Sequence, residues 1–171
     1  MAQVRTNVNN ICFGVGNVII DGRTVGAIQG EIVLTETRTV KEIDDVAQYP
    51  GQTLKVRMLG RKWFLRLNLY EANLQNLQLA LEGDVDGEQS KLVAGGTSSD
   101  KYVREHTIEI YGQGADLKNR KFYAYRAVVV EPGEINLFSN EGTRIPITFQ
   151  LLPVPGVPAS SNVFYILDYQ E

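Results

Sequence analysis

The sequence predicts a mainly β protein: a β-sandwich or barrel with one short flanking α-helix and a long inter-strand loop. Three observations favour this fold class. Apolar and polar residues alternate through several segments, which is typical of strands with one buried face. Dipeptides that favour tight turns separate these segments. A single segment has the apolar spacing of a helix.

The first element is a hairpin. The dipeptide Asp21-Gly22 stands between two apolar segments, residues 17–20 and 24–28. Asp-Gly suits the two-residue turn that joins antiparallel strands, because both turn positions need a positive φ angle. The two segments are therefore expected to pair as the strands of a hairpin.

Residues 31–43 are expected to form the next strand. Its beginning is amphipathic, but from Thr35 to Arg38 both faces are polar. A strand that is polar on both faces gains little from folding in a monomer. The pattern favours a strand with one face on a water-filled channel and the other against a neighbouring subunit.

A loop over residues 43–53 leads to two further alternating segments, residues 54–58 and 63–69. Their apolar phase changes around Gly60, which indicates a bulge or a tight bend. The loop exceeds the roughly two to five residues usual in a hairpin, so we expect it to be shaped for a function.

The helical segment covers residues 71–81. Its leucines Leu74, Leu77 and Leu81 recur at the spacing of one helix face. Glu71 complements the positive end of the helix dipole, and Gly83 is well placed to end the helix. One short amphipathic helix is therefore expected to pack on the sheet.

The second half of the chain starts with another long loop, residues 82–101, and then returns to strands. Residues 107–111 and 145–151 alternate, and residues 163–169 form a final strand. Pro146 lies on the polar phase of its segment. A proline in a strand points to an edge strand or a bulge.

The composition limits the classes of function. The 171 residues suggest one domain, 1–171, with a flexible N-terminal segment 1–10. The net charge of −3 disfavours tight nucleic-acid binding. One cysteine, Cys12, allows no disulfide within the chain, and no apolar run has the length of a membrane span or signal peptide. We expect a protein that is made in a reducing cytoplasm and does not enter a membrane.

No motif predicts catalytic, cofactor-binding or metal-binding residues. His106 is expected on a strand, and no nucleophile motif accompanies it. Gly14-Val-Gly16 begins like a dinucleotide fingerprint but lacks its third glycine and a following helix. The acidic segment 84–89 departs from the calcium-loop pattern. The sequence therefore predicts a protein that is not an enzyme.

Two charged patterns leave alternatives open. Glu105 and Glu109 share one strand phase, so they are either a solvated face or the paired carboxylates of a glycosidase. The basic residues Arg57, Arg61, Lys62 and Arg66 interleave with Trp63 and Phe64. Such a stretch either contacts single-stranded nucleic acid or forms a charged face or subunit contact.

The order of elements resembles the tail tube protein, or major tail protein, of tailed bacteriophages. The resemblance covers most of the chain, from the glycine-bearing first hairpin (16–26) through the polar strand (30–43). It continues through the loop that runs from acidic residues to Pro-Gly (44–51), the strand pair (54–70) and the helix. Residues 121–127, 132–134 and 145–149 are similar to the family's closing strands. Secretion-system inner tube proteins share this fold.

The resemblance implies a structural virion protein without cofactor or enzymatic activity. It implies self-assembly into hexameric rings that stack into a hollow tail tube through which viral DNA passes. Its partners are then copies of itself and other tail proteins, such as the tape measure and terminator. It also implies a location in the virion tail after synthesis in the host cytoplasm.

Particular residues receive roles from this resemblance. It implies that the loop residues Asp44, Asp45, Val46 and Tyr49 contact the next ring. A channel for DNA is best neutral or acidic, because acidic groups repel phosphates. Glu36 and Glu109, on polar strand phases, are the candidates to face that channel.

Two rival hypotheses remain. A monomeric β-sandwich module could bind carbohydrate or peptide on a stacking platform of Tyr123, Tyr125 and Trp63. A β-rich hydrolase would use Glu105 and Glu109. Self-association separates the first rival from a tube protein, and carboxylate-dependent turnover identifies the second.

Overall fold

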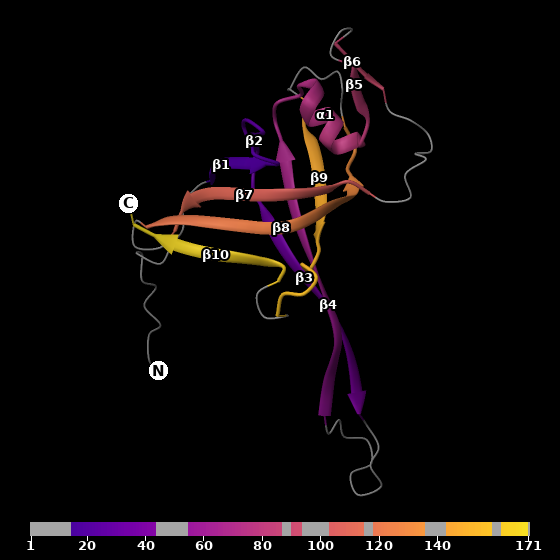
Figure 1. Cartoon of the computed structure of the whole chain (residues 1–171), viewed down its shortest axis with the longest axis vertical. Helices are drawn as coiled ribbons and strands as arrows, with labels where there is room; N and C mark the ends of the chain where they lie inside the picture. Colours follow the sequence, from indigo (N-terminus) through magenta and orange to yellow (C-terminus); the bar gives the residue numbers. More distant parts are fainter. Residues whose placement is uncertain are drawn as a thin grey trace, which may run out of the picture.

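A computed structural model describes residues 15–43, 55–86, 90–93, 103–114, 118–135, 143–158 and 162–170. The protein is mainly β, with antiparallel strands and one short helix, which confirms the predicted fold class. The main sheet is not closed into a barrel. Its strands run in the order β2-β1-β7-β8-β9-β4-β3, and β10 also pairs with β8 (Figure 1).

The elements have the following bounds. The strands of the main sheet are β1 (Val15–Ile20), β2 (Arg23–Thr24), β3 (Val33–Ile43), β4 (Lys55–Leu69), β7 (Glu105–Gln113), β8 (Asn119–Pro132), β9 (Ile145–Leu151) and β10 (Phe164–Tyr169). The helix is α1 (Leu74–Leu81). A separate two-stranded sheet, β5 (Asp84–Asp86) with β6 (Lys91–Val93), lies in a segment that was expected to be a loop. That expectation was therefore wrong.

The long strand β8 organises the core. One of its edges pairs with β7, while the other pairs with β10 near the start of the strand and with β9 near its end. The sheet therefore divides at β8. The buried core takes side chains from β1, β4, β7, β8, β9 and α1. The largest of those that are fully buried are Phe149, Leu65, Leu67, Leu69 and Ile108.

The first hairpin forms as predicted, with a shorter second strand. Ile19 pairs with Thr24 and Ile20 with Arg23 across the turn. The two turn residues have positive φ angles, 53° at Asp21 and 75° at Gly22, as a primed turn requires.

The hairpin of β3 and β4 is the longest feature of the sheet. β4 is one continuous strand, and the register slips between Thr39 and Val40, opposite Gly60 and Met58. The predicted phase change is therefore a bulge. Beyond it the two strands leave the body of the protein as an extended ribbon (Figure 1). We call its described residues, 38–43 and 55–61, the arm.

The helix is shorter than predicted, and its buried face differs in part from the predicted one. It begins after Asn73, whose side chain accepts from the Asn76 amide, and ends at Glu82 in the left-handed conformation. Glu82 therefore has the conformation expected of Gly83. Asn76, Leu79 and Ala80 are buried, whereas Leu81 is 41% exposed. Of the predicted Leu74–Leu77–Leu81 face, Leu77 packs against the core and Leu74 is partly buried, whereas Leu81 was wrongly assigned to it.

The buried side chain of Asn76 is satisfied by hydrogen bonds. Its side-chain amide donates to the carbonyls of Val25 (2.9 Å) and Glu71 (2.8 Å). Replacing it with alanine should destabilise the protein by about 2 kcal/mol, because two carbonyls lose their donor. Urea unfolding measures this. The exposed neighbour variant Gln75→Ala should cost less than about 0.5 kcal/mol, and equal effects of the two would contradict the role.

The position of strand β9 in the sheet differs from the expectation. Its proline pointed to an edge strand or a bulge. β9 is not an edge strand, because it lies between β8 and β4, but its register with β8 is irregular between Val129 and Glu131. Pro146 is only its second residue, near the strand end, where the loss of one N–H group is tolerated. The free edges of the described sheet therefore belong to other strands, chiefly β3 and β10.

Candidate assembly surfaces

The arm exposes apolar side chains that a monomer does not need. Val40, Val56, Met58 and Leu59 are between 44% and 58% exposed. A two-stranded ribbon without a third strand or a helix beside it is marginally stable in water. An exposed apolar ribbon of this kind is typical of a segment that packs against a partner.

The arm is also strongly basic. In the register, Arg38 lies opposite Arg61, and Lys41 lies opposite Arg57. Like charges directly across two strands destabilise the pair. Residues 33–69 hold seven basic and four acidic residues, a net charge of +3, whereas the whole chain carries −3. The remainder therefore carries −6, so the charge of the protein is divided between the long hairpin and the body.

Strand β10 is a second candidate surface. Among the described strands it pairs only with β8, which leaves its other edge free. Tyr165, Ile166 and Leu167 are 37%, 54% and 50% exposed. The strand contains no proline and a single charged residue. Natural proteins usually protect such an edge, so an apolar edge of this length favours pairing with another chain.

A cluster of tyrosines lies on the outward face of the sheet beside β10. The ring of Tyr123 is stacked on Tyr165 at 5.4 Å and meets Tyr125 edge-on at 5.2 Å. Lys121 lies over the rings of Tyr111 and Tyr123. The side chain of Trp63 packs on the other face, against Phe164 at 5.0 Å. The predicted platform therefore includes Tyr123 and Tyr125 but not Trp63.

The two channel candidates lie on opposite faces of the sheet. Glu36 pairs with Trp63 on the face that carries the core, and it contacts Arg38 at 2.6 Å and Arg61 at 3.7 Å. Glu109 pairs with Tyr123 on the outward face and contacts Lys121 at 2.8 Å. That either residue faces a channel stays a prediction. Because they lie on opposite faces of the sheet, the two side chains need not face the same channel.

The carboxylates of β7 are held ionised by separate cations. A hydrogen bond from Arg126 lowers the pKa of Glu105. Hydrogen bonds from Lys121 and then Tyr111 lower the pKa of Glu109, against the opposing effect of burial. A glycosidase needs one carboxyl with a raised pKa to donate a proton. Neither group has the environment of such an acid.

The Glu109 contacts should make stability depend on pH. Because its pKa is lowered on folding, the stabilisation is present above its ordinary value of 4.5 and is lost as the pH falls through the folded-state pKa. Glu109→Gln should lose about 1 kcal/mol at neutral pH, and the loss should shrink as the pH falls below 4.5 and the carboxylate of the wild type becomes protonated. Thermal unfolding across pH tests this against Glu131→Gln, an exposed control. A constant difference at every pH would contradict it.

Several predicted residues fall outside the described part of the chain. These are the proposed ring contacts Asp44, Asp45, Val46 and Tyr49, together with Cys12 and the N-terminal segment 1–10. The basic residues Arg57 and Arg61 lie on the arm, with Lys62 and Arg66 following on the same strand. The arm leads directly into residues 44–54, so the predicted contact loop belongs to the same hairpin.

His106 is more enclosed than the sequence indicated. It is the second residue of β7, its side chain is only 10% exposed, and its Nδ1 lies 2.6 Å from Asp21. The pairing joins residues 85 positions apart, which no local pattern reveals.

Within the described ranges, no group of three or more His, Cys, Asp or Glu side chains is placed to hold a metal, and no helix is long and apolar enough to cross a membrane.

The fold and the surfaces define an open antiparallel β protein with a basic projecting arm and an edge strand, β10, whose outer edge pairs with no other described strand. The chain matches no protein-family model and no curated protein. Its function is therefore argued from these surfaces.

Proposed function

We propose that this chain is the subunit of a self-assembling tube of the phage tail type, in which hexameric rings stack around a channel for viral DNA. The arm is the observation that carries the proposal. It combines exposed apolar side chains with the facing like charges of Lys41 and Arg57, and both features are unfavourable in an isolated subunit. A second copy that packs on the arm with an acidic surface would cover the apolar side chains and offset the like charges.

The β10 edge and the arm are suited to two different contacts. The edge of β10 is available for pairing between neighbours in one ring. The arm extends away from the sheet and is available for stacking between rings (Figure 1). Such head-to-tail contacts close into rings or grow into filaments, according to the rotation between subunits.

Sedimentation velocity and negative-stain electron microscopy of the concentrated full chain test the proposal. We expect rings or tubes that grow with protein concentration. Leu167→Lys on the β10 edge should prevent ring formation while the subunit stays folded, because its side chain is half exposed. A wild-type chain that remains a 19.1 kDa monomer at about millimolar concentration overturns the proposal.

The tyrosine cluster favours a second candidate, a binding module for carbohydrate. Three aromatic rings within about 6 Å of one another form a platform on which a sugar ring can stack. Titration with oligosaccharides, followed by tyrosine fluorescence, tests this. Binding by a monomer that Tyr123→Ala abolishes would favour the module over the tube subunit.

A further inference from the structure

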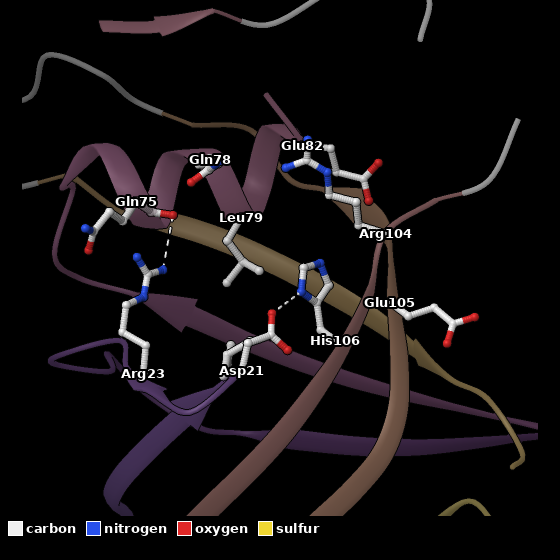
Figure 2. A pocket seen from close by; sticks show the side chains of 10 residues that line it. Asp21, Arg23, Gln75, Gln78, Leu79, Glu82, Arg104, Glu105 and His106 are labelled. Carbon is white, nitrogen blue, oxygen red and sulfur yellow. Dashed lines mark hydrogen bonds and ion pairs between the residues drawn. The ribbon is translucent and has the colours of Figure 1, made fainter. Parts of the chain in front are cut away.

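A polar cavity of about 480 Å³ lies beside the helix, and Glu105, one of the two carboxylates considered for a hydrolase, is among its lining residues. Residues of the β1–β2 hairpin, of α1 with Glu82 that follows it, and of the start of β7 line it (Figure 2). Its walls include Asp21, Arg23, Leu79, Glu82, Arg104 and His106. The sequence gives no sign of it, because its three walls are distant in the chain.

His106 presents an unused hydrogen-bond acceptor to this cavity. Its Nδ1 faces Asp21, which is itself held by the Thr107 amide at 2.8 Å. With Nδ1 donating to Asp21, Nε2 of the neutral ring is an acceptor. Nε2 is buried and has no partner in the described structure. It points to the side of the cavity where Glu82 and Arg104 lie (Figure 2).

Glu82 adds a second acceptor to the same cavity. Its Oε1 atom is also buried without a hydrogen-bond partner in the described structure. The Arg104 guanidinium close by donates at 2.6 Å to Asp84. A carboxylate oxygen and an imidazole nitrogen that both lack donors are best satisfied by a cationic group with several N–H donors.

The charge distribution identifies a source for that cation. No Lys or Arg occurs between residues 67 and 90, whereas Glu71, Glu82, Asp84 and Asp86 fall there. This acidic region, with α1 and β5, lies at one end of the long axis of the protein, and the arm lies at the other (Figure 1). Arg57, exposed on the arm and facing Lys41, is at the end that would meet it in a head-to-tail stack.

We infer that the cavity beside α1 is a receptor for the Arg57 side chain of a second copy of this chain. The guanidinium fork offers five donors, enough to serve Glu82 and His106 together. The contact separates Arg57 from the like charge of Lys41. The inference rests on the proposed tube and supplies the receiving half of its ring-to-ring contact.

Charge-swapped variants test the inference. Glu82→Lys reverses a charge in the cavity and leaves the arm unchanged. Arg57→Glu reverses a charge on the arm and leaves the cavity unchanged. Each variant alone should stack at least tenfold more weakly than wild type, as measured by sedimentation. A 1:1 mixture should regain stacking as an alternating assembly, because the arm of each variant matches the cavity of the other. The double variant should regain stacking to within about tenfold of wild type.

Matched controls make the result specific. Lys62→Glu carries the same charge change on an exposed residue of the same strand, and Glu31→Lys does so at an exposed acid outside the cavity. Both should stack like wild type, and circular dichroism should show every variant folded. Stacking that survives Glu82→Lys, a control as damaging as Arg57→Glu, or a double variant without rescue each overturns the inference while the tube proposal stands. A wild-type chain that never associates overturns both.

Discussion

Removing the arm should abolish the stacking of rings into tubes and leave the fold of the subunit intact. The variant would delete residues 40–59 and join Thr39 to Gly60 through an Asn-Gly turn. These two residues are directly paired, so a two-residue turn can close the shortened hairpin. The described side chains removed are exposed, Leu59 among them at 58%, and none belongs to the core.

The expected result is a folded species that does not assemble into tubes at any concentration where wild type does. Electron microscopy and sedimentation velocity measure assembly, while thermal unfolding should show a midpoint within a few degrees of wild type. A milder variant, Val56→Ser with Met58→Ser, keeps the arm and its charges and should weaken assembly only in part. Tubes of normal length from the deletion variant would show that the arm has no part in stacking.

Truncation of Phe149 should have the largest effect on stability. Its side chain is fully buried on the central strand β9, between β8 and β4, and meets the ring of His106 edge-on at 6.2 Å. Phe149→Ala should cost about 3–5 kcal/mol through lost burial and the cavity left behind. That is a large share of the roughly 5–15 kcal/mol typical of a native domain.

Thr148→Ala is the matched control for this truncation. Thr148 is the neighbouring residue of β9 and faces the other side of the sheet, where it is only partly buried. It should cost less than about 1 kcal/mol. Urea unfolding of the two variants measures the difference. Comparable losses would mean that β9 is not buried on one face as described.

The sequence by itself determined the features whose causes are local. The period-two pattern predicted a mainly β fold because a strand with one buried face must alternate. Asp21-Gly22 predicted the first turn because few dipeptides accept two positive φ angles. The phase change near Gly60 predicted the bulge in β4 because one extra residue exchanges the two faces of a strand.

Tertiary structure alone decided the features that depend on distant partners. Pro146 suggested an edge strand or a bulge, and pairing with β4 and β8 places β9 in the middle of the sheet. The helix buries Asn76 rather than Leu81 because its amide finds the Val25 carbonyl, 51 residues away. An analysis of periodicity considers apolar residues only, so it cannot predict a hydrogen bond of this kind.

The candidate site shows the same division. The basic residues of the long hairpin are visible in the sequence, but the strand register is what sets Arg57 opposite Lys41. The cavity exists only because folding brings Asp21, Glu82 and His106 together from three separate elements. Composition and local pattern determine which side chains are available, whereas long-range packing determines which of them are left without a partner, and so where a second chain can bind.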